Sequence, residues 1–269
     1  MPPAVAVVTD STAYLPEVPG VAVVPVQVIS GDQSWDEPEF AGNFATATTS
    51  RPAPERFASC YAALAAQGAA SAVSIHLSGD LSGTVEAART AAREAPLPVT
   101  VVDSRSIGMG VGFPVLAAAR AAEAGESLES VAAAATRCAA RTRTFFYVDT
   151  LDHMRRGGRI GAAASLLGSA LMIKPLLHLT DGRIALLEKV RTSARALTRL
   201  EDLAVEEAGD EPVEIAVQHL AAPDRAESLA ANLAKRVRGP AGIRVVEVGA
   251  VIGVHVGPGM LGITISPTS

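Results

Sequence analysis

The chain has 269 residues, of which 49% are hydrophobic and only 4% aromatic, so its core must be built from aliphatic side chains. A formal net charge of −5 at pH 7, with no cluster of lysine and arginine interleaved with aromatic residues, argues against a nucleic-acid partner. The two distant cysteines, Cys60 and Cys138, fit neither a disulfide framework nor a metal site and indicate a reducing, cytoplasmic location.

Three apolar strands in the first half of the chain each run into a loop rich in hydroxyl side chains. These strand-and-loop segments are residues 4–12, 71–84 and 99–112. Alanine-rich helices are expected between and after them, at residues 54–66, 85–94, 113–124 and 127–141. The alternation predicts an α/β fold with a Rossmann-like parallel sheet flanked by helices. Ligands of such sheets bind at the carboxyl ends of the strands, so the three loops mark the expected ligand edge.

The second half changes character after about Val148, which predicts a first domain of residues 1–148 and a second of residues 149–269. Two strand-like runs flank Asp181-Gly182, and Asp-Gly between apolar runs indicates a hairpin with a type I′ turn. Further elements are expected at residues 192–208 (helix), 213–219 (strand), 223–237 (helix) and 243–265 (a strand-rich end). This order predicts a C-terminal α/β domain with a mixed or antiparallel sheet.

The longest apolar run, residues 160–179, is interrupted by Lys174, Pro175 and His178. Its uninterrupted part is shorter than the roughly 20 residues that a membrane span needs, so no transmembrane segment is expected. A helix over residues 160–173 is expected instead, either packed on all sides or lining a lipid-filled cavity. The chain runs from Met1 almost directly into a strand, so no signal peptide is expected.

The loop at residues 78–84 carries the most specific chemical signal. It lies between a predicted strand and a predicted helix, and it offers hydroxyl groups and backbone N–H groups at the positive end of the helix dipole. It lacks the lysine that a nucleotide-binding P-loop requires. The pattern favours a small, singly charged ligand group such as a carboxylate, and a helix cap at Ser82 that binds no ligand fits the residues equally well.

Short motifs, in order along nearly the whole chain, resemble those of the DegV family, which includes the fatty-acid-binding subunit of bacterial fatty acid kinase. They are Thr9-Asp10-Ser11, Thr49-Ser50-Arg51-Pro52, Leu81-Ser82-Gly83-Thr84, Val102-Asp103-Ser104, Gly157-Gly158-Arg159-Ile160, Lys174-Pro175, Asp181-Gly182, Lys189-Val190-Arg191 and His255-Val256-Gly257-Pro258-Gly259. The resemblance implies a two-domain protein that buries a long-chain fatty acid in a tunnel between its domains. It also implies that the carboxylate is presented to a separate ATP-binding kinase subunit, which forms an acyl phosphate for phospholipid synthesis. Such a chain is a lipid-binding protein rather than an enzyme, and it needs no cofactor or metal.

By the same resemblance, the carboxylate is held by Thr49, Ser82 and the N–H of Gly83, while Arg159 and His255 assist phosphoryl transfer by the partner kinase. An ordinary salt bridge for Arg159 and a buried core position for His255 are the alternatives. The other four histidines have no metal-ligand spacing and are expected to be structural, namely His76, His153, His178 and His219.

Two departures from the family pattern bear on the ligand. Gly79 stands where a serine is common, and Arg51 stands where a glutamine is common. An added arginine near the head-group is expected to tighten carboxylate binding or to alter which partner docks.

Two other functions stay open. A serine hydrolase or acyltransferase that uses Ser82 and His255 is disfavoured, because Gly79-Asp80-Leu81-Ser82-Gly83 lacks the Gly-x-Ser-x-Gly spacing of α/β-hydrolase nucleophiles. A sensor of polar small molecules would need several charged groups near its ligand, and the three loops offer mainly hydroxyl groups. A fatty-acid carrier is also compatible with transient contact with a membrane surface.

Overall fold

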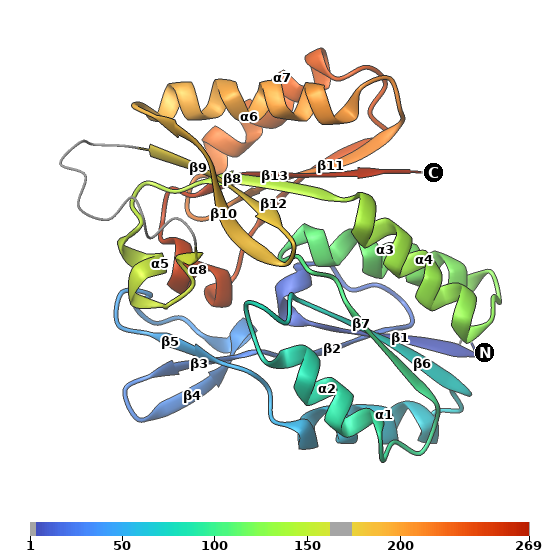
Figure 1. Cartoon of the computed structure of the whole chain (residues 1–269). Coiled ribbons are helices and arrows are strands. Elements are labelled where there is room, and N and C mark those ends of the chain that lie inside the picture. Colours follow the sequence, from blue (N-terminus) through green and yellow to red (C-terminus); the bar gives the residue numbers. More distant parts are fainter. Residues whose placement is uncertain (1–3, 162–173, 269) are drawn as a thin grey trace. The chain divides into compact units, whose positions relative to one another are not determined.

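The computed structural model describes residues 4–161 and 174–268, so most of the helix expected over residues 160–173 lies outside the described residues. The chain divides into two compact units. The first comprises Met1–Ala41 and Thr49–Ala140, and the second comprises Gly42–Thr48 and Arg141–Ser269. Both are coloured along the sequence in Figure 1.

A four-stranded parallel sheet forms the centre of the first unit, in the order β2-β1-β6-β7. Its strands are β1 (Val5–Asp10), β2 (Val21–Val24), β6 (Ser71–His76) and β7 (Val99–Asp103). Thr9 of β1 pairs with Ile75 of β6, so these two strands end side by side. Because β2 and β6 flank β1 on opposite sides, the carboxyl ends of β1 and β6 mark the topological switch point at which ligands of such sheets bind.

Side chains of this sheet alternate between two helical layers, as the two-residue period of a strand requires. The helices are α1 (Pro54–Ala66), α2 (Thr84–Ala92), α3 (Met109–Glu123) and α4 (Leu128–Arg141). Val5 and Val7 pack with residues of α3 and α4, whereas Ala6 and Val8 pack with residues of α1 and α2. Figure 1 shows one helix pair on each face of the sheet. The predicted parallel α/β architecture is therefore confirmed.

A small sheet of order β4-β3-β5 follows β2 along the chain. Its strands and the two short 3-10 helices of this region are β3 (Gln27–Ser30), β4 (Gln33–Asp36), β5 (Thr48–Ser50), η1 (Ser11–Ala13) and η2 (Glu37–Glu39). Asp36 receives two bonds of 2.6 Å from the Arg56 guanidinium of α1, and this bidentate pair lowers the pKa of the Asp36 carboxyl. The pair ties the hairpin of β3 and β4 to α1.

A six-stranded mixed sheet forms the centre of the second unit, in the order β10-β9-β8-β13-β11-β12. Its strands are β8 (Arg143–Tyr147), β9 (Lys174–Thr180), β10 (Arg183–Val190), β11 (Val213–His219), β12 (Gly242–Glu247) and β13 (Leu261–Pro267). Only β11 and β12 pair in parallel, and the other neighbours are antiparallel. The mixed sheet expected for the C-terminal half is thus confirmed.

In the described part of this unit, four helices accompany the sheet, namely α5 (Asp152–Arg156), α6 (Ser193–Ala208), α7 (Pro223–Arg236) and α8 (Ala250–Val256). Leu200 of α6 and Leu229 and Leu233 of α7 belong to one buried cluster with Ile215 and Ile263 of the sheet. The four-residue spacing of the α7 leucines places them on one helix face, which explains why α7 docks by that face. Within the described ranges, no helix has the length and apolar character needed to cross a bilayer.

The predicted hairpin joins β9 and β10. Its two turn residues, Asp181 and Gly182, have φ values of 50° and 79°. Positive φ at both positions is what a type I′ turn requires, so the Asp-Gly signal identified this turn correctly.

The strand-rich end expected at residues 243–265 is only partly observed. Between β12 and β13 the chain forms helix α8, so the expectation that His255 lies in a strand-rich tail was wrong. Six of the seven residues of α8 are buried. Packing of this kind overrides the weak strand preference of its valine and isoleucine residues. Gly257, with φ 73°, ends the helix in a conformation that glycine adopts readily.

Candidate functional site

The loop that joins β6 to α2 is folded around Ser78. The Ser78 N–H donates to the Ser106 carbonyl at 2.8 Å, and the Ser78 carbonyl accepts bonds of 3.0 Å from the N–H groups of Leu81 and Ser82. The Ser78 hydroxyl oxygen accepts a bond of 3.2 Å from the Asp80 N–H. Because Ser78 is fully buried, these bonds hold the loop in a defined shape.

Asp103 lies at the end of β7, the strand next to β6, and it accepts hydrogen bonds from the beginning of this loop. Its carboxylate accepts the Gly79 N–H at 3.2 and 3.3 Å and the Arg105 N–H at 2.8 Å. A Cβ atom at position 79 would lie 3.0 Å from Asp103 Oδ2. Glycine in place of the common serine therefore gives this carboxylate room to approach the loop backbone.

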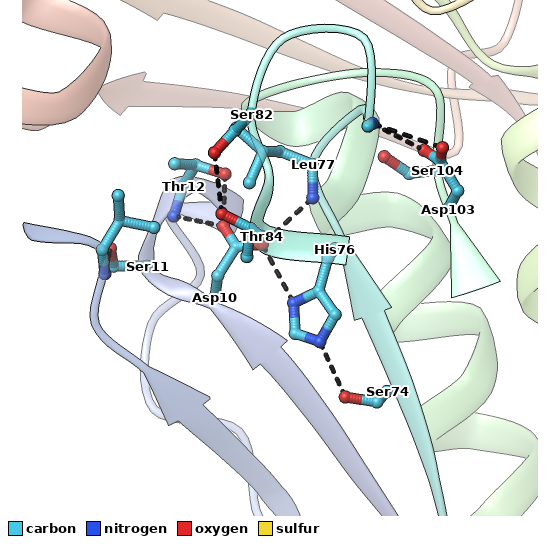
Figure 2. Close-up of polar contacts among 12 residues, drawn as sticks. Asp10, Ser11, Thr12, Ser74, His76, Leu77, Ser82, Thr84, Asp103 and Ser104 are labelled. Atoms are coloured by element: carbon cyan, nitrogen blue, oxygen red, sulfur yellow. Dashed lines mark hydrogen bonds and ion pairs between the residues drawn. The ribbon is translucent and has the colours of Figure 1, made fainter. Parts of the chain in front are cut away.

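Helix α2 begins directly after the loop, with Gly83 at its N-cap position and no side-chain cap. The Ser82 hydroxyl lies 2.9 Å from the Thr84 hydroxyl (Figure 2). Ser82 is therefore not a cap of this helix, which was the alternative that the sequence allowed. Among the described residues, the backbone N–H groups of Gly83 and Thr84 have no hydrogen-bond partner. The half-buried Ser82 hydroxyl and these N–H groups are thus available to an anionic ligand.

The segment that carries Thr49 reaches the same loop. Thr49 is half-buried in β5, and Arg51 follows this strand. A Cβ atom on Gly83 would lie 2.6 Å from Nη1 of Arg51, so the Arg51 side chain lies against Gly83. The Thr49-Ser50-Arg51-Pro52 motif and the Leu81-Ser82-Gly83-Thr84 motif therefore meet within the first unit.

Beneath the loop, a chain of buried polar side chains links helix α1 to the end of β1. Tyr61 Oη lies 2.9 Å from Ser74 Oγ, Ser74 Oγ lies 2.7 Å from His76 Nε2, and His76 Nδ1 lies 3.0 Å from Asp10 Oδ2. Figure 2 shows this chain from Ser74 to Asp10. All four side chains are fully buried, and burial raises the pKa of the Tyr61 phenol to about 12. The phenol therefore stays neutral and can donate toward Ser74.

Asp10 is the end point of this chain and accepts further bonds. Its Oδ2 also accepts the Leu77 N–H at 3.0 Å, and its Oδ1 accepts the Thr12 N–H at 3.1 Å and the Thr12 hydroxyl at 2.5 Å. Leu77 immediately precedes the loop, so Asp10 fixes the point at which the loop leaves β6. His76 is expected from the sequence to be structural, but its pairing with Asp10 is not among the expected contacts. The available signal in the sequence is that each residue ends a predicted parallel strand, which places both at the same edge of the sheet.

In the second unit, the structure brings Arg159 and His255 together. Arg159 Nη1 donates to the Gly157 carbonyl at 2.8 Å. A Cβ atom on Gly157 would lie 2.0 Å from His255 Nδ1, which shows that the imidazole of α8 packs directly on the Gly157 backbone. Gly157 thus allows the close approach of the His255 imidazole, and Arg159 lies beside this histidine.

Electrostatics keep this histidine neutral at physiological pH. Burial, and then the positive charge of Arg159, lower the pKa of His255 to about 4. A neutral imidazole can accept a proton or a hydrogen bond from a neighbouring group. In the part of the chain that is described, no group of three or more His, Cys, Asp or Glu side chains could hold a metal ion.

Comparison with protein families identifies the chain. The family model described as "Uncharacterised protein, DegV family" matches residues 4–268. The chain belongs to the DegV family. A DegV domain-containing protein of Streptomyces coelicolor is 54% identical over 97% of this chain and 98% of its own length. A DegV domain-containing protein of Mycobacterium tuberculosis is 42% identical over 81% of this chain and 79% of its own length.

Solved structures of DegV proteins share the fold over nearly the whole chain. A structure described as "Fatty Acid Binding of a DegV family Protein from Thermus thermophilus" is 34% identical, with a TM-score of 0.91, over 98% of this chain and 99% of that one. DegV of Bacillus subtilis, described as a fatty acid binding protein, is 30% identical, with a TM-score of 0.86, over 98% of this chain and 99% of that one. The family expected from the motifs is therefore confirmed.

Proposed function

We propose that this DegV protein binds a long-chain fatty acid and presents its carboxylate to a separate ATP-dependent kinase that forms an acyl phosphate. The main support is the structural likeness, over 98% of the chain, to a DegV family protein from Thermus thermophilus that is described as binding a fatty acid. In this proposal Thr49, Ser82 and the N–H of Gly83 hold the carboxylate. The protein is a lipid carrier that works in the cytoplasm and has no catalytic turnover of its own.

The chemistry of the loop suits this ligand. The Ser82 hydroxyl and the Gly83 N–H are donors, and hydrogen bonds to a charged acceptor contribute about 1.5 to 3 kcal/mol each. Donors fixed by Ser78 and Asp103 do not have to be ordered when the carboxylate binds, which lowers the entropic cost of binding.

The acyl chain supplies most of the expected affinity. Burial of about 14 methylene groups at about 0.8 kcal/mol each gives a gross gain of about 11 kcal/mol before the costs of binding are subtracted. We propose, from the family resemblance, that this chain is buried between the two units. Such a gain is large enough for the lipid to stay bound during purification.

In the proposed phosphoryl transfer, Arg159 and His255 assist the partner kinase. A guanidinium stabilises negative charge that develops on a transferring phosphoryl group. The neutral imidazole of His255, with its pKa lowered to about 4, can act there as a hydrogen-bond acceptor without adding charge. The sequence carries no P-loop lysine in its glycine-containing loop, in agreement with ATP binding on a separate subunit.

A serine hydrolase is the alternative. The chain contains a Ser74, His76 and Asp10 series, but the Ser74 hydroxyl is fully buried and lies 2.9 Å from the Tyr61 hydroxyl, where no substrate carbonyl can reach it. For Ser82 as the nucleophile, turnover of an activated ester that disappears in Ser82→Ala would support the hydrolase and contradict the carrier.

Identification of the co-purified lipid tests the carrier function directly. We expect native mass spectrometry and lipid extraction to reveal a fatty acid on the purified protein or after incubation with free palmitate. Absence of an acyl chain in both experiments would reject the proposal.

Two substitutions then separate binding from transfer. Ser82→Ala is expected to weaken palmitate retention about tenfold, from the loss of one bond to the carboxylate. Arg159→Ala should leave retention unchanged and reduce acyl phosphate formation in the presence of the kinase. Ser34→Ala, at an exposed position on β4, is the matched control for the serine. Equal losses of binding in Ser82→Ala and Arg159→Ala would contradict this division of roles.

A further inference from the structure

Arg51 is an exposed residue that lies beside the groups proposed to bind the carboxylate. It follows the last residue of β5 and precedes Pro52, which is buried. A residue before proline is restricted to extended backbone conformations, so the direction in which the Arg51 side chain leaves the backbone is limited. The strand on one side and the buried proline on the other thus aim this arginine at the start of α2.

The side chain of Arg51 covers Gly83. A Cβ atom on Gly83 would lie 2.6 Å from Arg51 Nη1, 2.8 Å from Cδ and 3.4 Å from Cζ. The backbone of Gly83 has φ −72°, a value that any residue adopts, so its backbone conformation does not require glycine. The Arg51 guanidinium occupies the space that a Cβ atom would fill, so a side chain at this position would displace the guanidinium. The positive charge therefore lies next to the N–H that is proposed to bind the carboxylate.

The charge of Arg51 is not neutralised by an acidic side chain of the described chain. Other arginines have such partners, for example Arg56 with Asp36 at 2.6 Å and Arg244 with Glu214 at 2.8 Å. For the Arg51 guanidinium, neither an ion pair nor a hydrogen bond is found within residues 4–161 and 174–268. A guanidinium keeps its charge over the whole physiological pH range and binds carboxylates through paired N–H donors.

We infer that Arg51 is a ligand-binding residue that donates to the fatty-acid carboxylate and makes this protein selective for ionised lipids over neutral ones. The inference rests on the proposed function, because it takes the carboxylate held by Ser82 and Gly83 as its ligand. Arg51 adds a compensating positive charge to a site whose other donors are uncharged. An alcohol of the same chain length can use the hydroxyl and N–H donors but gains nothing from this charge.

Binding of two probes that differ only in the head-group tests this role. Delipidated full-length protein is titrated with palmitate and with 1-hexadecanol. Arg51→Gln is expected to weaken palmitate binding about tenfold to about 100-fold and to leave hexadecanol binding unchanged within about twofold. Arg51→Lys, which keeps the charge but loses the paired donors, should fall between Arg51→Gln and the wild type. Arg89→Gln, at an exposed position on α2, makes the same change in net charge away from the loop and should alter neither affinity.

The outcomes separate the inference from the proposed function. If wild-type protein binds palmitate and Arg51→Gln binds it equally well, the role of Arg51 is refuted while the carrier function stands. If palmitate and hexadecanol weaken together in Arg51→Gln, Arg51 acts through the fold of the loop rather than through its charge, and the inference is again wrong. If the wild type binds neither probe, the fatty-acid function fails and the role of Arg51 fails with it.

Discussion

Replacement of Asp10 with asparagine tests how strongly the buried polar chain stabilises the first unit. The wild-type carboxylate accepts four hydrogen bonds, two on each oxygen, from the Thr12 N–H and hydroxyl and from His76 and the Leu77 N–H. Asparagine keeps the shape but has only one acceptor oxygen. Its NH2 group must therefore face two former donors, and in either orientation one buried backbone N–H, of Thr12 or of Leu77, loses its acceptor.

The expected loss follows from these contacts. A buried donor without an acceptor costs about 1 to 3 kcal/mol, and the remaining bonds lose the strengthening that a charged acceptor provides. Asp10→Asn should therefore lower the free energy of unfolding of the first unit by about 2 to 5 kcal/mol, a large share of the stability of an ordinary domain.

Urea unfolding followed by tryptophan fluorescence measures this loss. The single tryptophan, Trp35, lies on β4 in the first unit, so it reports on the unit that contains Asp10. Asp32→Asn, at an exposed position between β3 and β4, makes the same chemical change and should alter the unfolding free energy by less than about 0.5 kcal/mol. A loss below about 1 kcal/mol in Asp10→Asn would refute the reasoning that the carboxylate is an essential acceptor.

Two further predictions concern the second unit, and both use circular dichroism in urea as the measurement. Gly157→Ala should lower the free energy of unfolding by about 1 to 3 kcal/mol, because the added Cβ would lie 2.0 Å from His255 Nδ1. Gly242→Ala, which has open space around the added Cβ, should lower it by less than about 1 kcal/mol. Equal losses in the two variants would contradict this packing. The pKa of His255 is about 4 in the folded chain and 6.5 in its ordinary state, so the unfolded chain binds more protons between these pH values. The free energy of unfolding should therefore fall by up to about 3 kcal/mol as the pH falls from 6.5 to 4. His255→Asn should flatten that fall, and an unchanged pH profile would show that the folded-state pKa is not lowered.

Local patterns in the sequence were sufficient for most elements. Continuous apolar strands alternating with alanine-rich helices identified the parallel sheet of the first unit, and Asp181-Gly182 identified the hairpin of the second. The sequence was insufficient for α8, because a short run of valine and isoleucine has no intrinsic preference strong enough to decide between strand and helix. Burial of six residues in α8 decided it, and that burial depends on segments far away in the sequence.

The motifs predicted which residues form the candidate site, but only the fold shows which residues they contact. Arg51 and Gly83 are 32 positions apart, and the contact between them exists only once β5 and α2 are folded. Asp10 and His76 likewise meet because β1 and β6 are parallel neighbours in register. No local pattern encodes which strands become neighbours.

By itself, the sequence determined the α/β class, the family and the absence of a lysine from the loop that follows β6, since each of these depends on residue type and short-range spacing. Only the tertiary structure decided that Asp103 and Ser78 shape this loop, that Asp10 holds its starting point and that an unpaired guanidinium, within the described residues, covers Gly83. The physical reason is that hydrogen bonds and charge interactions act over a few ångströms in space, whatever the separation of the residues along the chain.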